Sequence, residues 1–190
     1  MKGVEGAHTI MAVKLMKINR TWAMPNKWTF KIKPINELLS KYVKDEGGRW
    51  IDPFAGKYSF AEYAYTNDLN PEMPSKYHQE AYIYLQEYPD DFFEGGLFDP
   101  PYSPRQVKEC YEGFGRKVTF SDTKCTFYSK VKDELARIIK PDGLAICCGW
   151  NSMGLGKGRG FKQIEILLVA HGGNRNDTIV TVERKTEGVK

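Results

Sequence analysis

The stretch Gly95-Gly96-Leu97-Phe98-Asp99-Pro100-Pro101-Tyr102 decides the fold of this 190-residue chain. Its first half is a short apolar run typical of a buried strand, and its second half is typical of the loop after a strand. Ligands of open α/β sheets bind outside the carboxyl ends of the strands, so residues 99–102 lie where a catalytic loop is expected. The alternative is a plain turn into a helix, since Ser103-Pro104 often starts one.

The residue types of this loop fit one kind of chemistry. An amine attached to a nucleobase or a carbonyl is a poor nucleophile because its lone pair is delocalised. The Asp99 carboxylate and the Pro100 carbonyl can each accept one N–H bond, which leaves the lone pair free to attack in line. Proline fixes the backbone and has no N–H that would compete. Tyr102 offers a flat face for a base removed from its stack.

A second apolar run, Trp50-Ile51-Asp52, also ends in Asp-Pro and a small-residue turn. Together the two segments resemble the DNA adenine-N6 methyltransferases that use S-adenosylmethionine (SAM), with their Asp-Pro-Pro-Tyr catalytic loop and Phe-x-Gly-x-Gly cofactor loop. The resemblance covers about residues 20–150. It implies SAM as cofactor, S-adenosylhomocysteine as product and DNA as partner. It also implies two sets of site residues: Asp99, Pro100, Pro101 and Tyr102 as catalytic, and Asp52, Pro53, Phe54, Ala55, Gly56 and Asp99 as cofactor-binding.

The cofactor loop departs from the family pattern at one position. Tyr58 stands where the family has its second glycine, and the next strand follows so soon that a helix between them has almost no room. This departure keeps open a different class of protein, a non-catalytic nucleic-acid-binding protein that retains the fold.

Four further residues extend the resemblance to the cofactor. Asp68, the last residue of the run 63–68, matches the acid that accepts the ribose hydroxyls, although it also fits an Asx turn. Glu80 matches an acid beside the adenine ring of SAM, although it equally fits the start of a helix over 81–86. Trp28 and Phe30 belong to a segment that resembles the N-terminal motif beside the methionine moiety, although such aromatic residues are as often core.

Charge varies strongly along the chain. The net charge is +4, yet residues 7–36 contain six basic residues and no acid, and residues 62–99 contain nine acids and one lysine. Basic stretches at 105–132 and 154–160 flank the predicted catalytic loop, and aromatic residues accompany the basic ones in 113–128. We expect contacts with nucleic-acid phosphates there, against the alternative of solvated surface charges. The candidates are Arg105, Arg116, Lys117, Lys157 and Arg159.

Composition limits the class of protein. A 190-residue chain with 41% hydrophobic residues is expected to form one domain, residues 1–190, with a real core. It contains no apolar run long enough to cross a membrane and no signal-peptide pattern, so we expect a soluble, cytoplasmic protein without a membrane partner. The four cysteines show no zinc-ligand spacing, and no metal site is predicted.

The alternation of strand and helix patterns predicts the architecture. Residues 34–44, 104–114 and 126–140 have helical signals, and residues 49–52, 63–68, 95–98 and 144–150 have strand signals. Strands at 162–171 and 177–185 are separated by a glycine- and asparagine-rich turn. The sequence therefore predicts an α/β fold, a doubly wound, mostly parallel sheet with a C-terminal antiparallel hairpin.

The function predicted from these features is methyl transfer from SAM to the N6 amine of adenine in DNA. The gap between Tyr102 and Leu144 is too short for a separate recognition domain, so loops would select the target. RNA or a protein amide remains an alternative substrate, because the same pair of acceptors would activate either. Aspartate rather than asparagine or serine at position 99 favours adenine.

Overall fold

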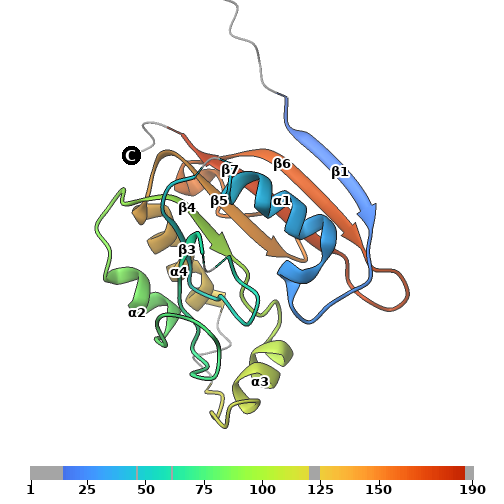
Figure 1. Ribbon diagram of the computed structural model, residues 1–190, viewed down its shortest axis with the longest axis vertical. Coiled ribbons are helices and arrows are strands. Elements are labelled where there is room, and N and C mark those ends of the chain that lie inside the picture. Colours follow the sequence, from blue (N-terminus) through green and yellow to red (C-terminus); the bar gives the residue numbers. More distant parts are fainter. Residues whose placement is uncertain (1–14, 46, 61, 120–124, 187–190) are drawn as a thin grey trace, which may run out of the picture.

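The computed structural model describes residues 15–45, 47–60, 62–119 and 125–186, which fold around one seven-stranded sheet (Figure 1). The strand order is β1-β6-β7-β5-β4-β2-β3. Only β7 runs antiparallel to its neighbours. The predicted mostly parallel sheet with a terminal antiparallel hairpin is thus confirmed. The strands are β1 (Lys17–Trp22), β2 (Trp50–Asp52), β3 (Ala64–Thr66), β4 (Phe93–Phe98), β5 (Ile139–Gly149), β6 (Phe161–Ala170) and β7 (Thr178–Lys185).

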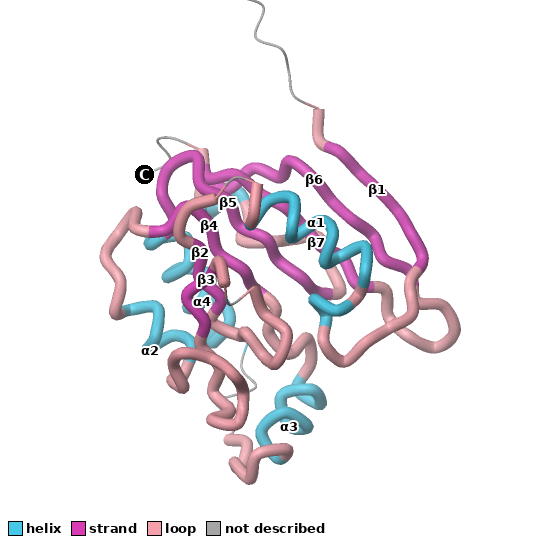
Figure 2. Tube along the Cα trace, in the orientation of Figure 1, coloured by secondary structure: helices cyan, strands magenta, loops and turns pink. Residues whose placement is uncertain are grey.

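Helices cover both faces of the sheet (Figure 2). One face carries α1 (Lys33–Val43), which begins with Pro34 in its first turn and buries an apolar stripe. The other face carries α2 (Ala81–Gln86) and α4 (Cys125–Ile138). The helix α3 (Pro104–Glu112) buries only Val107 and projects away from these layers. Two short 3-10 turns, η1 (Thr29–Lys31) and η3 (Lys157–Arg159), complete the described elements.

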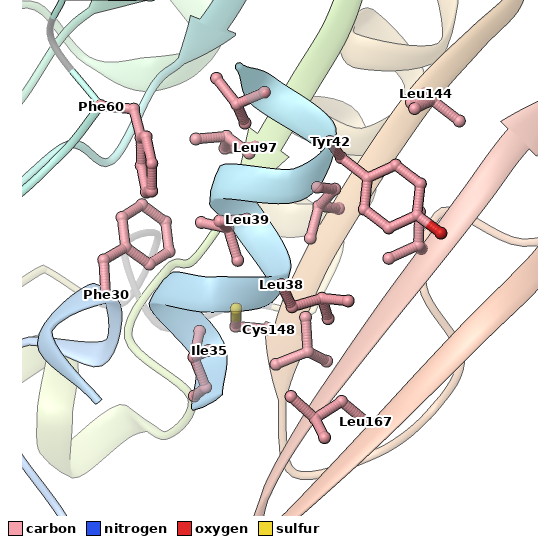
Figure 3. Close-up of a cluster of buried hydrophobic side chains, with 14 of the residues drawn as sticks. Phe30, Ile35, Leu38, Leu39, Tyr42, Phe60, Leu97, Leu144, Cys148 and Leu167 are labelled. Carbon is pink, nitrogen blue, oxygen red and sulfur yellow. The ribbon is translucent and has the colours of Figure 1, made fainter. Parts of the chain in front are cut away.

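The alternating side chains of the central strand separate two apolar clusters. Leu144 and Cys148 of β5 belong to the cluster that α1 covers, with Leu144 on the side of Tyr42 and Cys148 on the side of Leu38 and Ile35 (Figure 3). Cys147 belongs to the cluster on the α4 face. The two cysteines fill core positions as small apolar side chains.

A glycine in β4 allows the closest packing in the sheet. A Cβ at Gly95 would lie 2.5 Å from the ring of Trp50 on the neighbouring strand. The indole therefore lies flat against the backbone of β4, and any larger residue at position 95 would displace it. This contact holds β2 beside β4 and brings the loops that follow the two strands together.

The sequence did not predict β1. This strand pairs in parallel with β6, from Lys17 opposite Glu165 to Trp22 opposite Ala170, and forms an edge of the sheet. Five of its six residues are exposed, so no alternation of buried and exposed side chains marks it. The run predicted as a strand at 63–68 is shorter, Ala64–Thr66. The strand predicted at 144–150 starts earlier, because β5 begins at Ile139 directly after α4. None of the described helices has the length and apolar composition that a bilayer crossing requires.

Candidate active site

A cavity of about 650 Å³ opens at the carboxyl ends of β2, β3 and β4. It collects residues from the segment before α1, from the loop after β2 and from the loop after β4. All the predicted catalytic and cofactor residues except Asp52 line it: Trp28, Phe30, Pro53, Phe54, Ala55, Gly56, Asp68, Glu80, Asp99, Pro100, Pro101 and Tyr102. Segments that are 70 residues apart in the sequence therefore meet at the edge of the sheet where the strand pattern predicted a site.

Asp52 lies beneath the cavity instead of in its wall. Its side chain is fully buried, with one oxygen accepting a hydrogen bond from Phe54 N at 3.1 Å and the other accepting one from the Ser59 hydroxyl. Burial raises the pKa of Asp52 to about 7, and the two hydrogen bonds oppose the rise. Asp52 thus shapes the loop 53–59 from below.

Asp68 connects this loop to the end of β3. Its Oδ2 accepts a hydrogen bond from Gly56 N at 2.9 Å, and its Oδ1 accepts one from Asn70 N at 2.8 Å. The second bond is the Asx turn that the sequence offered as an alternative. Burial raises the pKa of Asp68, yet the carboxylate remains part of the cavity wall. The Asp68 side chain therefore forms the Asx turn and also lines the cavity.

Asn67 is a site residue that the sequence analysis missed. Its buried side chain donates to Pro53 O at 3.2 Å and to Gln79 O at 3.0 Å, and accepts from Gln79 N at 2.8 Å. Its main chain also bonds to Asp52 O and Ala55 N. Asn67 therefore fixes the loop after β2 to the segment before α2. The position at a strand end, directly before the predicted Asp68, was its only signal in the sequence.

Glu80 is the N-cap of α2. Its carboxylate accepts hydrogen bonds from Tyr82 N at 3.0 Å and Ile83 N at 3.4 Å, which is the helix-start role offered as an alternative. It also lines the cavity, so the helix start adds a second carboxylate to the same wall as Asp68.

The loop 99–102 is fixed by the first turn of α3. Tyr102 N donates to Gln106 Oε1 at 2.6 Å, while Gln106 N donates to Ser103 Oγ at 3.2 Å, which caps the helix. The Tyr102 hydroxyl donates to Asp99 Oδ1 and lies 3.4 Å from the Thr29 hydroxyl. The predicted helix start and the predicted catalytic loop are therefore parts of one structure.

The environment of Asp99 makes it more basic than an ordinary aspartate. Burial raises the pKa of Asp99 to about 6, although the Tyr102 hydrogen bond opposes the rise. Burial also raises the pKa of Tyr102, whose ring meets that of Trp150 edge to face at 5.8 Å. The phenol therefore keeps its proton at neutral pH and acts as a donor.

The predicted phosphate-binding residues are not gathered at this cavity. Arg105 pairs with Glu109 at 2.7 Å, and Arg116 and Lys117 line a separate cavity of about 450 Å³ beside α3. Arg159 Nε bonds to Asp133 of α4 at 2.6 Å, and Lys157 lies with it in η3. The strand that follows η3 starts opposite Lys185, at the end of the sheet away from Asp99. Residues 120–124 of the stretch 113–128, and residues 7–14 of the basic N-terminal stretch, lie outside the described residues.

Comparisons with known proteins identify the fold. No protein-family model matches the sequence, and no curated protein does. Among solved structures, one similar to this chain is the 1,6-didemethyltoxoflavin-N1-methyltransferase of Burkholderia thailandensis with bound S-adenosylhomocysteine, at 14% identity over 82% of this chain and 78% of that chain, with a TM-score of 0.56.

Two further structures agree. The N-methyltransferase NodS of Bradyrhizobium japonicum in complex with S-adenosylhomocysteine matches at 11% identity over 82% of this chain and 87% of that one, with a TM-score of 0.53. TrmN of Thermus thermophilus matches at 16% identity over 81% of this chain, with a TM-score of 0.54, and the chain spans 49% of its length. These likenesses show that the chain has a methyltransferase fold.

Proposed function

We propose that this protein transfers a methyl group from SAM to the N6 amine of adenine in DNA. The observation that carries the proposal is the meeting of the Asp99-Pro100-Pro101-Tyr102 loop with the loop after β2 in one cavity. The similar structures that contain S-adenosylhomocysteine support SAM as the cofactor. Aspartate at position 99 is the feature that favours adenine.

The residues of the cavity fit SAM. Asp68 has carboxylate oxygens at the cavity wall that can accept from ribose hydroxyls, and Glu80 stands farther along the same wall. A Cβ on residue 56 itself would lie 3.0 Å from the Trp28 ring. Glycine at position 56 therefore avoids a close contact with a ring that lines the cavity. When bound, SAM supplies an electrophilic methyl group.

Asp99 and Pro100 would hold the target amine. A carboxylate has about four acceptor positions, so the Tyr102 hydroxyl on Oδ1 leaves room for an N–H bond of the substrate. The Pro100 carbonyl would accept the other N–H bond and so orient the nitrogen lone pair. The amine loses a proton when it is methylated, and Asp99, with its pKa of about 6, is a stronger proton acceptor than an ordinary aspartate.

The test is a transfer reaction with product identification. The purified protein is incubated with SAM and adenine-containing DNA, the DNA is hydrolysed, and the nucleosides are analysed by mass spectrometry. The proposal predicts N6-methyladenine, and no methylated nucleoside from DNA that lacks adenine. Methylation of RNA or of a protein amide, without methylation of DNA, would replace the proposed substrate. Failure to bind SAM in calorimetry would favour the non-catalytic alternative.

A further inference from the structure

Tyr58 lies at the rim of the cavity, at the position where the cofactor loop departs from the family pattern. Its side chain is 38% exposed and meets the Trp28 ring edge to face, with the ring centroids 5.8 Å apart. Both rings line the cavity. The tyrosine at this position thus adds a partly exposed aromatic surface to the wall of the cavity proposed for the cofactor and the target base.

Lysines surround these two rings. Lys31 Nζ lies 4.3 Å from the centroid of Tyr58, Lys57 Nζ lies 5.9 Å from it, and Lys27 Nζ lies 5.2 Å from the centroid of Trp28. All three side chains are exposed. Within residues 15–45, 47–60, 62–119 and 125–186, no carboxylate forms an ion pair with any of the three.

The three lysine side chains would be stabilised by a bound anion. Like charges that are gathered on a small surface repel one another, and the rings offset only a part of that repulsion. A nucleic-acid strand would supply both missing partners, because its phosphates attract ammonium groups and its bases stack on aromatic rings.

We propose that Trp28, Tyr58, Lys27, Lys31 and Lys57 form a binding site for the nucleotide next to the target adenine in a single DNA strand. We call these five residues the rim site. The two ring planes lie 69° apart, so one ring stacks face to face on the neighbouring base while the other contacts its edge. The three lysines contact the phosphates that flank this base. The inference rests on the proposed function, since it takes the target to be an adenine in DNA. It also gives this chain a means of holding the strand beside an extruded base.

The test compares two acceptors. One is a short single-stranded oligodeoxynucleotide with one adenine, and the other is deoxyadenosine, which lacks the neighbouring base and the phosphates. Tyr58→Ser should weaken oligonucleotide binding about 5- to 150-fold, as expected for loss of one stacked base. The rate of transfer to deoxyadenosine should fall less than the rate of transfer to the oligonucleotide, because deoxyadenosine has no neighbouring base to stack on Tyr58.

The lysines are tested through salt. With Lys31→Gln and Lys57→Gln combined, the slope of log affinity against log salt should become shallower by about 1.4, because each phosphate contact on a single strand contributes about 0.7. The matched controls are Tyr63→Ser and Lys44→Gln. Tyr63 is 40% exposed with Lys44 Nζ 5.4 Å from its ring centroid, and neither residue lines the cavity. The controls should bind the oligonucleotide like the wild type.

Several results would overturn the inference. One is a salt slope and an oligonucleotide affinity that match those of the control variants. Another is a fall in the transfer rate to deoxyadenosine as large as the fall for the oligonucleotide. A third is a loss of SAM affinity, measured by calorimetry, that exceeds the loss of oligonucleotide affinity. Either of these would place the rim-site residues at the cofactor. A wild type that binds the oligonucleotide without methylating it would refute the proposed function alone, since binding by the rim-site variants would still decide this inference. A wild type that binds no oligonucleotide would refute the rim site even if deoxyadenosine is methylated.

Discussion

Asp99 combines burial with a hydrogen bond from Tyr102, and both affect its charge. Burial raises the pKa of its carboxyl group to about 6, while the Tyr102 hydroxyl stabilises the ionised form. The ionised form is the one that can accept two N–H bonds or a proton from the substrate. The protonation state of a single side chain therefore controls the proposed reaction.

We predict that the single-turnover rate of methyl transfer rises with pH through an apparent pKa of about 6. In Asp99→Asn this rise should disappear, because the amide does not titrate, and a partial rate should remain because the amide keeps one acceptor. Rapid-quench measurements from pH 5 to pH 8 would check both. A wild-type rate that is flat with pH, or a variant that keeps the same rise, would show that another group titrates.

Asp52 should make the stability of the protein depend on pH, in the direction opposite to the rate. Its pKa is raised from 3.8 to about 7 in the folded state, so the folded protein binds more protons than the unfolded chain between these pH values. The free energy of unfolding therefore falls as pH rises from about 4 to 7. The change corresponds to at most about 4 kcal/mol.

Asp52→Asn should remove this contribution. The amide can accept from Phe54 N and donate to the Ser59 hydroxyl, so it keeps the shape of the loop without a titrating group. Urea denaturation at pH 4.5 and pH 8 should show a smaller fall in stability for the variant than for the wild type. Equal falls for both proteins would mean that Asp52 does not titrate in this range.

At the level of the elements, the site is a set of loops tied to strand ends. Asn67 holds the loop after β2 to the segment before α2, and Asp68 holds Gly56 N. The first turn of α3 fixes the loop after β4 through Gln106. Each loop is held by a side chain from another element, so the cavity depends on the register of the strands.

We predict that Asp68→Ala weakens SAM binding by about 1–3 kcal/mol, the range for a hydrogen bond to a charged group. Asp68→Asn should lose less, because the amide oxygen can still accept from Gly56 N. Isothermal titration calorimetry would measure both, with the exposed Asp45→Ala as the control. If Asp68→Ala binds SAM as tightly as the control does, Asp68 has no ribose contact.

The sequence predicts the central elements and most of the cavity wall because their signals are local. Apolar residues at helical spacing mark α1, and Asp-Pro steps after short apolar runs mark the ends of β2 and β4. The Asp99 loop and the Gly56 loop meet because parallel strands place their carboxyl ends at one edge.

The features that the sequence does not reveal are those whose partners lie far away along the chain. β1 is a strand only because β6 pairs with it, and its exposed side chains carry no pattern. Asn67 acts through backbone groups of Pro53 and Gln79, 14 and 12 residues away. Arg159 contacts α4 because the fold brings η3 beside that helix, and the amino-acid composition does not reveal this proximity.

At the scale of the whole molecule, a mostly parallel sheet with helices on both faces places the Asp99 carboxylate and a cofactor-sized cavity at the same edge. The exposed segments carry different charges around this edge, with lysines on the rim beside Trp28 and carboxylates from β3 to α2. The fold thus presents a basic approach to a cavity with an acidic wall, which fits a polyanionic substrate and a cationic cofactor.

The central claim is that Asp99 acts on the substrate amine in the transition state. The most direct measurement is the single-turnover transfer of a labelled methyl group from SAM to adenine-containing DNA by the wild type and by Asp99→Ala, with SAM affinity measured in parallel. We predict a rate about 10²–10³ lower in the variant, the usual loss of a transition-state hydrogen-bond partner, with SAM affinity changed much less. A variant that transfers methyl as fast as the wild type would contradict the claim, and the segment Asp99-Pro100-Pro101-Tyr102 would then be only the turn that starts α3.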